Sequence, residues 1–383
     1  MLVEFDRLKP LLCCPRTRVP LIGDAAMLRC ADDHRCNYSA VQGAPVLIDF
    51  ARSILSAEEV TENNVDSPVR RRVPEGLKRA VKRVLSPEKK STRRNIDRLI
   101  AALPRDRAPL VLVIGGGTVG QGMRALYEHP DLGIAAFDIY YSPNIQFIAD
   151  AHSIPLRDRS VDAVVIQAVL EHVLDPQQVV DEIWRVLKPD GLVYAETPFL
   201  QHVHEGAYDF TRFTESGHRF LFRRFELVDS GCSGGPGTQL TWSIDYFARA
   251  VFRSRLAGKM FKLAFSWLQL FDAFVPSSYA SDAASGVYFL GRRSVRNVSP
   301  QEIVAFYRGA QASTPRRSCM RQNGLERGSS NMQRIRRDGT AIAWRSEWKD
   351  ALGSPNSING PRPRRSDSIH WSATIIGRYA PGA

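Results

Sequence analysis

The chain has 383 residues, 44% of them apolar and 24% charged, so it is long enough to bury the core of one large α/β domain with additions. Its net charge is +12, but residues 311–383 hold 13 basic and 5 acidic side chains, which leaves a surplus of +4 on the rest. A surplus of that size does not indicate a nucleic-acid-binding surface. Six cysteines in this length exclude a disulfide scaffold.

Targeting and membrane-spanning patterns are not expected. Residues 1–10 intersperse charges and contain no apolar run, which argues against a signal peptide. The longest apolar window of the C-terminal half, residues 263–271, is bounded by Lys262 and Asp272 and falls well short of the roughly 20 residues that span a bilayer. We therefore expect a cytoplasmic protein.

Residues 1–50 are predicted to form a small β-rich module that resembles a zinc ribbon. A complete ribbon supplies four ligands from two Cys-x-x-Cys knuckles, but Thr17 stands where the second cysteine of the first knuckle belongs. One alternative is a zinc site built from Cys14, Cys30 and Cys36 with either Cys13 or His34. The other, which we expect, is a degenerate ribbon that its apolar core holds together without metal.

Residues 51–105 are predicted to be a basic helical linker. The part from 70 to 94 is rich in Lys and Arg with apolar residues at helical spacing, and a second helix is predicted at 95–103. Such a basic face is typical of a solvated surface, and contact with phosphate is the alternative.

An apolar run at 111–114 leads directly into a glycine-rich turn, and a helix is predicted to begin at Gln121. Gly115, Gly117 and Gly120 match G-x-G-x-x-G, in which glycines allow a tight turn and the close approach of a ligand. The motif alone is weak, because glycine-rich loops also serve only as connections.

Further strands are predicted at 134–139, 145–148, 161–167 and 192–196, with a helix at 176–187 and a turn at 188–191. Strands that alternate with helices predict a parallel, doubly wound sheet with a ligand crevice at the carboxyl ends of the strands. Asp138, Asp150 and Gln167 each sit at the carboxyl end of one of these strands, so we expect them to line that crevice.

The last two strands are predicted at 225–228 and 286–290, which completes an α/β fold with a mostly parallel, seven-stranded sheet. Residues 231–285 are a predicted insertion before the last strand, a glycine-rich loop followed by aromatic helices over 242–274. We expect a helical cap that packs on the sheet. The alternatives are a lid over a substrate bound in the crevice and a patch that contacts lipid. A final helix is predicted from Ser299, and 311–383 are predicted to be a disordered basic tail.

Residues 108–230 resemble a class I S-adenosylmethionine-dependent methyltransferase of the type 11 kind, within a predicted domain of residues 106–310. The resemblance rests on the glycine loop, Asp138, Asp150-Ala151, and the stretches 167–176 and 182–192. One departure is Val113, which occupies the position where the family usually has an acidic residue.

The resemblance implies that S-adenosyl-L-methionine is the cofactor. Asp138 would accept hydrogen bonds from the ribose, Asp150 from the adenine amino group, and Gln167 would lie near the methionine portion. The implied cofactor-binding set is Gly115, Gly117, Gly120, Asp138, Ile139, Asp150, Ala151 and Gln167. A nicotinamide enzyme also fits the glycine loop, but the chain has no second dinucleotide-binding half.

The loop 197–214 is expected to cover the crevice, and it resembles a bacterial methyltransferase subgroup with a histidine followed by Tyr-Asp-Phe-x-Arg-Phe-Thr. His204, Tyr208 and Asp209 are the catalytic candidates, and a base is needed only if the acceptor must lose a proton. In the alternative, Asp209 pairs with Arg212 to hold the loop, and His204 is structural.

These features together imply methyl transfer to an unidentified acceptor, with a small molecule or a glycan or lipid-linked precursor as the first choice. An RNA methyltransferase (for ribosomal or transfer RNA) and a non-catalytic binding module are the alternatives. A nucleic-acid partner is disfavoured because the part outside the tail carries only +4. Peripheral membrane contact is expected, if anywhere, through 242–274.

Overall fold

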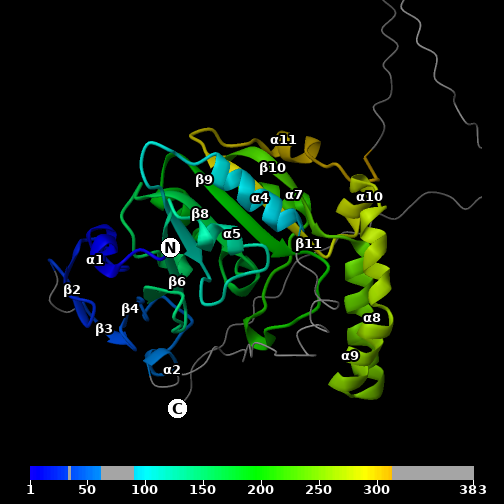
Figure 1. Ribbon diagram of the computed structural model, residues 1–383, viewed down its shortest axis with the longest axis horizontal. Helices are drawn as coiled ribbons and strands as arrows, with labels where there is room; N and C mark the ends of the chain where they lie inside the picture. Colours follow the sequence, from blue (N-terminus) through cyan, green and yellow to red (C-terminus); the bar gives the residue numbers. More distant parts are fainter. Residues whose placement is uncertain (33–35, 62–89, 313–383) are drawn as a thin grey trace, which may run out of the picture. The chain divides into compact units, whose positions relative to one another are not determined.

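The computed structural model describes residues 1–32, 36–61 and 90–312, all within one compact unit (Figure 1). Several sequence predictions lie outside the described residues: the basic helix over most of 70–94, His34 as a metal ligand, and nearly all of the predicted tail 311–383.

The described residues form an eleven-stranded sheet in the order β1-β2-β3-β4-β7-β6-β5-β8-β9-β11-β10. Pairing is parallel from β7 through β6, β5 and β8 to β9, whereas β11 runs antiparallel between β9 and β10. The predicted α/β, Rossmann-like fold is therefore confirmed. The strands are β1 Leu21–Gly23, β2 Met27–Cys30, β3 Asn37–Val41, β4 Ala44–Leu47, β5 Leu110–Ile114, β6 Gly133–Asp138, β7 Phe147–Ala149, β8 Val161–Gln167, β9 Leu187–Pro198, β10 Phe225–Gly234 and β11 Gly286–Arg293.

The helical elements precede, connect and follow these strands. They are α1 Phe5–Leu8, η1 Lys9–Leu11, α2 Ala57–Thr61, α4 Lys90–Ala101, α5 Arg124–Glu128, η2 Ala151–Ser153, η3 Leu170–His172, α6 Pro176–Val186, η4 Gly206–Tyr208, α7 Glu215–Leu221, α8 Pro236–Phe252, α9 Arg255–Ala264, η5 Ser266–Ala273, α10 Ser277–Asp282 and α11 Pro300–Ala305.

Strand β5 lies at the centre of the sheet because its apolar run buries both faces. Val111 and Val113 pack into one core cluster, where α4 contributes Ile96 and Leu99. Leu112 and its neighbours on that face pack into the other cluster, to which α6 contributes several side chains. Unbroken apolar runs of this kind are characteristic of strands that helices cover on both sides.

Several predicted element ends differ from the structure, and three of them are described here. The helix after the glycine loop begins at Arg124, not Gln121, because Gly122 has φ +80°, which is incompatible with a right-handed helix. The predicted turn at 188–191 lies within the bounds of β9, where Asp190 has φ +61°. Strand β10 continues to Gly234, through residues predicted to be the start of a loop.

The N-terminal β module extends the main sheet, since β4 pairs in parallel with β7. Thr17, at the position of a knuckle cysteine, contacts two of the cysteine sulfurs. Its Oγ1 lies 3.3 Å from the Cys30 Sγ, and its backbone N–H donates to the Cys14 Sγ at 3.3 Å. The Tyr38 hydroxyl is 3.1 Å from the same Cys14 sulfur. A β-rich module is thus confirmed, while its kinship to zinc ribbons stays a prediction.

The insertion forms a helical arm, which we define as α8, α9 and η5. Helices α8 and α9 run side by side beside the sheet, with Phe252 and Phe261 in contact between them (Figure 1). Asp272 of η5 accepts backbone hydrogen bonds from Gly237 and Thr238 at the start of α8, where a carboxylate complements the helix dipole. Among the described residues, no helix is long and apolar enough to cross a membrane.

His218 on α7 makes fold stability dependent on pH. Its ring is packed among Phe213, Phe222 and Phe289, and neither ring nitrogen has a hydrogen-bond partner among the described residues. Burial lowers the pKa of His218 to about 3.

We expect the free energy of unfolding to fall as pH decreases from about 6.5 towards 3, by about 1.4 kcal/mol per pH unit from this group. The unfolded chain binds a proton in that range, whereas the folded chain does not. Urea unfolding at about pH 7.5 and about pH 5 measures the loss. His218→Phe should reduce this pH dependence, and an unchanged dependence in the variant would contradict the assignment.

Candidate active site

The glycine loop after β5 requires glycine at its three motif positions. Gly115 has φ +74°, and a Cβ there would lie 2.3 Å from a Val169 methyl carbon. A Cβ on Gly117 would lie 2.7 Å from the Asp138 Oδ2, and one on Gly120 would lie 1.8 Å from the Gln167 Oε1. A side chain at Gly115 would be strained by the positive φ, and Cβ atoms at Gly117 and Gly120 would push aside the ends of the Asp138 and Gln167 side chains. The observed contacts of these side chains with the loop therefore need glycine at all three positions.

The structure brings the glycine loop together with Asp138 and Gln167. The Gly117 N–H donates to the Asp138 Oδ2 at 2.8 Å, and the Ile139 N–H donates to the Oδ1 at 2.8 Å. The Gln167 side-chain amide donates to the Gln121 carbonyl at 3.2 Å. These residues follow β5, β6 and β8, whose carboxyl ends share one edge of the sheet.

A buried carboxylate that sequence analysis missed lies beside this loop. Val113, at the usual acidic position, is buried in the apolar core, whereas Glu196 near the end of β9 is only 2% exposed. The Glu196 Oε2 accepts hydrogen bonds from Thr92 and Gln167, each at 2.8 Å. The only signal in the sequence was the place of Glu196 at the end of a predicted strand. Many solvent-facing carboxylates occupy the same kind of position, so this signal could not identify a buried one.

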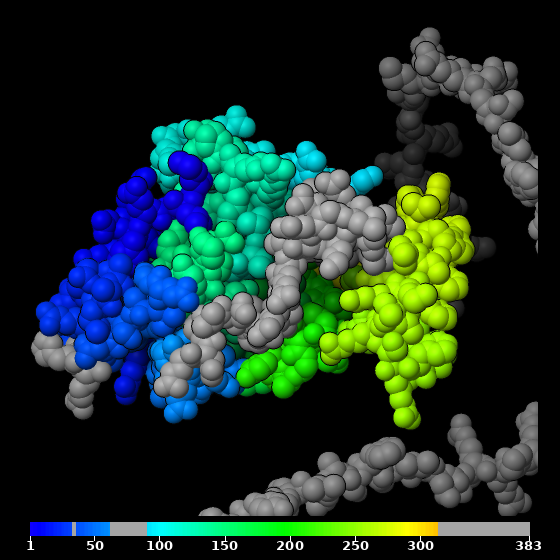
Figure 2. Space-filling model, turned by 60° about the horizontal axis from the view of Figure 1, so that its bottom comes forward, coloured from blue at the N-terminus to red at the C-terminus, as the bar shows by residue number. Residues whose placement is uncertain are grey.

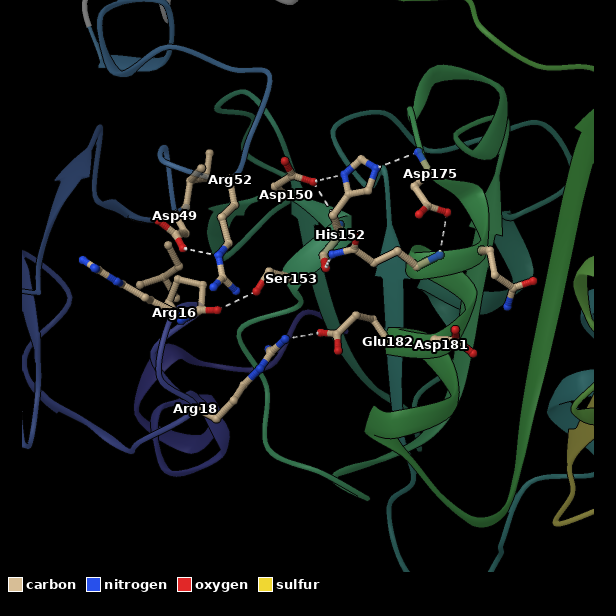
Figure 3. A pocket seen from close by; sticks show the side chains of 15 residues that line it. Arg16, Arg18, Asp49, Arg52, Asp150, His152, Ser153, Asp175, Asp181 and Glu182 are labelled. Atoms are coloured by element: carbon tan, nitrogen blue, oxygen red, sulfur yellow. Dashed lines mark hydrogen bonds and ion pairs between the residues drawn. The ribbon is translucent and has the colours of Figure 1, made fainter.

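Asp150 has different neighbours from Asp138. Its Oδ1 lies 2.6 Å from the His152 Nδ1 (Figure 3). Its Oδ2 accepts a hydrogen bond from the Ser53 hydroxyl. Burial would raise the pKa of Asp150, but these hydrogen bonds outweigh it and lower the pKa below its usual value. Ala151, the next residue, is buried.

Asp150 faces a cavity of about 450 Å³ between the N-terminal module and α6 (Figure 3). His152 and Asp175 both line this cavity, and the His152 Nε2 accepts a hydrogen bond from the Asp175 backbone N–H at 3.2 Å. The glycine loop and Asp138 are not among the residues that line it. The charged side chains of the lining include Arg16, Arg18, Arg52, Asp49, Asp181 and Glu182.

The acceptor loop after β9 is held by a buried ion pair. Asp209 has a fully buried side chain, pairs with Arg212 through both oxygens, and accepts a hydrogen bond from the His204 backbone N–H at 2.8 Å. Although burial opposes it, these contacts lower the pKa of Asp209 to about 2. An ionised carboxylate so occupied suits holding the loop better than accepting a proton from a substrate. Tyr208, by contrast, has an exposed side chain.

His204 lies beside His172 and Glu171. The two imidazole rings meet edge to face with centroids 4.9 Å apart, and the His172 Nδ1 lies 2.7 Å from the Tyr208 carbonyl oxygen. Burial lowers the pKa of His172 despite that hydrogen bond. Sequence analysis treated His172 only as a packing residue, since the contact crosses 32 residues of chain.

The helical arm contacts the acceptor loop directly. The Tyr246 hydroxyl of α8 donates to the Val203 carbonyl at 2.8 Å, and the Tyr246 ring stacks on His202 with centroids 4.4 Å apart. The arm is the yellow-green body at the side of the domain in Figure 2. The side of the candidate site where the acceptor was expected is therefore built from η3, the loop after β9 and α8; we call it the acceptor side.

The parallel order β7-β6-β5-β8-β9 with an antiparallel β11-β10 end, and a glycine loop joined to the acidic end of β6, define a Rossmann-like methyltransferase domain. A family model described as a methyltransferase domain matches residues 130–195. This part of the chain carries a domain of the class I S-adenosylmethionine-dependent methyltransferases. The cofactor of this class is S-adenosyl-L-methionine, and the glycine loop joined to the Asp138 carboxylate is the part of this chain whose chemistry fits it.

Two curated relatives are similar over part of the chain. A malonyl-acyl-carrier protein O-methyltransferase of Marinomonas sp. is 33% identical over 116 residues, which are 27% of this chain and 43% of that protein. A demethylmenaquinone methyltransferase of Renibacterium salmoninarum is 35% identical over 151 residues, which are 38% of this chain and 60% of that protein. The chain thus spans about half the length of the curated relatives it matches.

Among solved structures, the phosphoethanolamine N-methyltransferase 2 of Haemonchus contortus in complex with S-adenosyl-L-methionine is 15% identical, with a TM-score of 0.35. The match covers 56% of each chain.

Asp209→Ala should destabilise the protein by roughly 2–3 kcal/mol, because it leaves the mostly buried Arg212 guanidinium without its carboxylate. Arg124→Ala is a matched control, since it removes an ion pair with Glu128 in which both side chains are exposed, and such pairs contribute under about 1 kcal/mol. Urea unfolding of both variants measures the difference. Equal losses would show that the buried pair does not hold the acceptor loop.

Proposed function

We propose that this protein transfers a methyl group from S-adenosyl-L-methionine to a small-molecule acceptor that is held at a lipid surface. The observation that carries the transfer is the 2.8 Å hydrogen bond between the glycine loop and Asp138 at the carboxyl edge of the sheet. The relatives are named as enzymes acting on a malonyl-acyl-carrier protein and on demethylmenaquinone, which supports an acceptor other than nucleic acid.

In this proposal the glycine loop and the strand ends bind different parts of the cofactor. Asp138 takes the ribose hydroxyls, and Gly115, Gly117 and Gly120 take the methionine portion through their backbone. Gln167, held by Glu196, stands next to the reacting end. Asp150 and Ala151 take the adenine, which requires the Asp150 carboxylate to exchange the Ser53 hydroxyl for the adenine amino group.

The bound cofactor supplies an electrophilic methyl group on a sulfonium, and the protein's part is to position the acceptor and exclude water. Three features of the acceptor side support that role. Tyr208 and its loop lie over η3, the Asp209–Arg212 pair keeps the loop in place, and Tyr246 of the arm closes one side. Where the acceptor must lose a proton, His204 is the proposed base.

The lipid surface is proposed from the helical arm. Phe247 and Phe274 are 72% and 81% exposed, and an apolar surface of this extent on a soluble fold is typical of an interaction site. Arg253, Arg255 and Lys259 are exposed on the same arm, which favours anionic head groups. The other large apolar side chains exposed there are Leu240, Val251, Phe252, Leu256, Met260, Phe261, Leu263, Phe265, Trp267, Leu270 and Phe271.

Two further basic residues of the arm, Arg249 and Lys262, are engaged within the arm itself. Arg249 pairs with Asp245 on the same helix, and Lys262 lies 6.0 Å from the Trp242 ring. Burial lowers the pKa of Lys262. The lipid-facing charge is therefore assigned to Arg253, Arg255 and Lys259 alone.

Asp138→Ala should weaken binding of S-adenosyl-L-methionine by about tenfold or more, since hydrogen bonds to a charged group contribute about 1.5–3 kcal/mol. Calorimetric titration measures the dissociation constant, and Asp138→Asn separates loss of charge from loss of the loop contact. Asp158→Ala is the control, because this 70% exposed carboxylate precedes β8 at the opposite edge of the sheet. No binding by the unaltered protein would exclude the proposed transfer.

With methyl-labelled cofactor and separated cell fractions, label should enter the lipid extract. A Phe247→Ser, Phe274→Ser double variant should lose roughly tenfold or more of its binding to anionic vesicles, because buried aromatic side chains contribute about 1.5–3 kcal/mol each. Its binding of the cofactor should not change. Val304→Ser, which alters a 79% exposed side chain on α11, is the control.

Uptake of label by RNA would replace the proposal with the RNA methyltransferase alternative. If only water-soluble small molecules took up the label and all variants bound vesicles equally, the methyl transfer would stand. The proposal of a lipid-binding surface would then be wrong.

A further inference from the structure

Three potential metal ligands converge on the acceptor side, although they come from two loops far apart in sequence. One carboxylate oxygen of Glu171 and one ring nitrogen each of His172 and His204 lie within 4.8 Å of one another. This is the one such group among residues 1–32, 36–61 and 90–312, and the described cysteines of the N-terminal module do not form another.

The hydrogen bonds of His172 leave its second nitrogen suited to a metal. A carbonyl oxygen can only accept a hydrogen bond, so the 2.7 Å contact with the Tyr208 carbonyl places a proton on the His172 Nδ1. In the neutral ring the lone pair is then on the Nε2, which lies 3.7 Å from the Glu171 Oε1. Histidines that bind metals commonly donate their other N–H to a backbone carbonyl or a carboxylate in this way.

His204 repeats this arrangement. Its Nδ1 lies 3.2 Å from the Asp209 Oδ2 and 3.3 Å from the His202 carbonyl oxygen, and both of these atoms are acceptors. A proton on the Nδ1 again leaves the Nε2 lone pair for a ligand. The Asp209–Arg212 pair that holds the loop therefore also orients a second imidazole.

The cluster is anchored on both sides. Backbone N–H groups of Phe210 and Thr211 donate to the Glu171 carbonyl at 2.8 and 3.3 Å, which joins the acceptor loop to η3. Glu171 is 1% exposed and the His204 side chain is 24% exposed, so the cluster opens to solvent on its His204 side. Two imidazoles and one carboxylate with an open position are typical of sites for divalent transition metals.

We infer that Glu171, His172 and His204 bind a divalent transition-metal cation of the Zn²⁺ type at the acceptor side of the crevice. With the metal bound, His204 is a ligand and is no longer available as the base proposed above for the metal-free site. The open coordination position is available to an oxygen of the acceptor, and this role, unlike the binding itself, rests on the proposed function.

Calorimetric titration of metal-free, untagged protein with Zn²⁺ tests the site. The unaltered protein should bind a zinc ion that His172→Ala and Glu171→Gln bind at least about tenfold more weakly, since loss of even an outer partner costs that much. His129→Ala, which removes a histidine from the end of α5, should bind as the unaltered protein does. Equal binding by His172→Ala and the unaltered protein would overturn the inference.

Two further measurements keep the outcome clear. Co²⁺ bound to the unaltered protein should give the absorption of nitrogen and oxygen ligands, whereas thiolate absorption, or loss of binding in Cys14→Ser, would assign the metal to the N-terminal module and overturn the site. Titration of the same samples with S-adenosyl-L-methionine separates the two proposals. If the protein binds the cofactor but not zinc, only the proposed metal site is wrong. If it binds zinc but not the cofactor, only the proposed methyl transfer is wrong.

Discussion

The parallel pairing of β5 with β6 on one side and β8 on the other is the constraint on which the candidate site depends. Ile114 is level with Phe137 and with Ile166 in the two registers, so the residues that follow these three strands arrive at one edge together. A shift of one residue would also exchange the two faces of β5 between the two core clusters. The cores therefore fix the position of the glycine loop against Asp138 and Gln167.

The acceptor side depends on a different kind of interaction. Backbone hydrogen bonds from Phe210 and Thr211 to the Glu171 carbonyl join the loop after β9 to η3. Side chains fix the rest of its position through the buried Asp209–Arg212 pair, the His172 contact with the Tyr208 carbonyl, and the stacking of Tyr246 on His202. A buried charge pair is costly to break because one partner is left desolvated. The loop is thereby held in one geometry, and the apolar arm is attached to the same surface from which an acceptor would approach.

The N-terminal module belongs to the same sheet as the methyltransferase core. Because β4 pairs with β7, the segment that follows β4 passes the carboxyl end of β7 and carries Ser53 to Asp150. Arg18 reaches from the module to Glu182 of α6. The surroundings of Asp150, which we propose to bind adenine, are therefore shaped by a module whose own metal-ligand pattern is incomplete, with Thr17 hydrogen bonded where a cysteine would stand.

The sequence by itself determined the order of strands and helices and the place of the glycine loop and Asp138 at the carboxyl ends of the strands, because apolar period and glycine position are local properties of the chain. Helix ends depended on details such as the φ of Gly122, which no pattern of residue types states. Only the tertiary structure decided that Asp209 is occupied by Arg212, that Glu196 is buried beside Gln167, and that His172 meets His204. Those contacts join residues that fold topology brings together, and their energies come from burial, which a single sequence does not record.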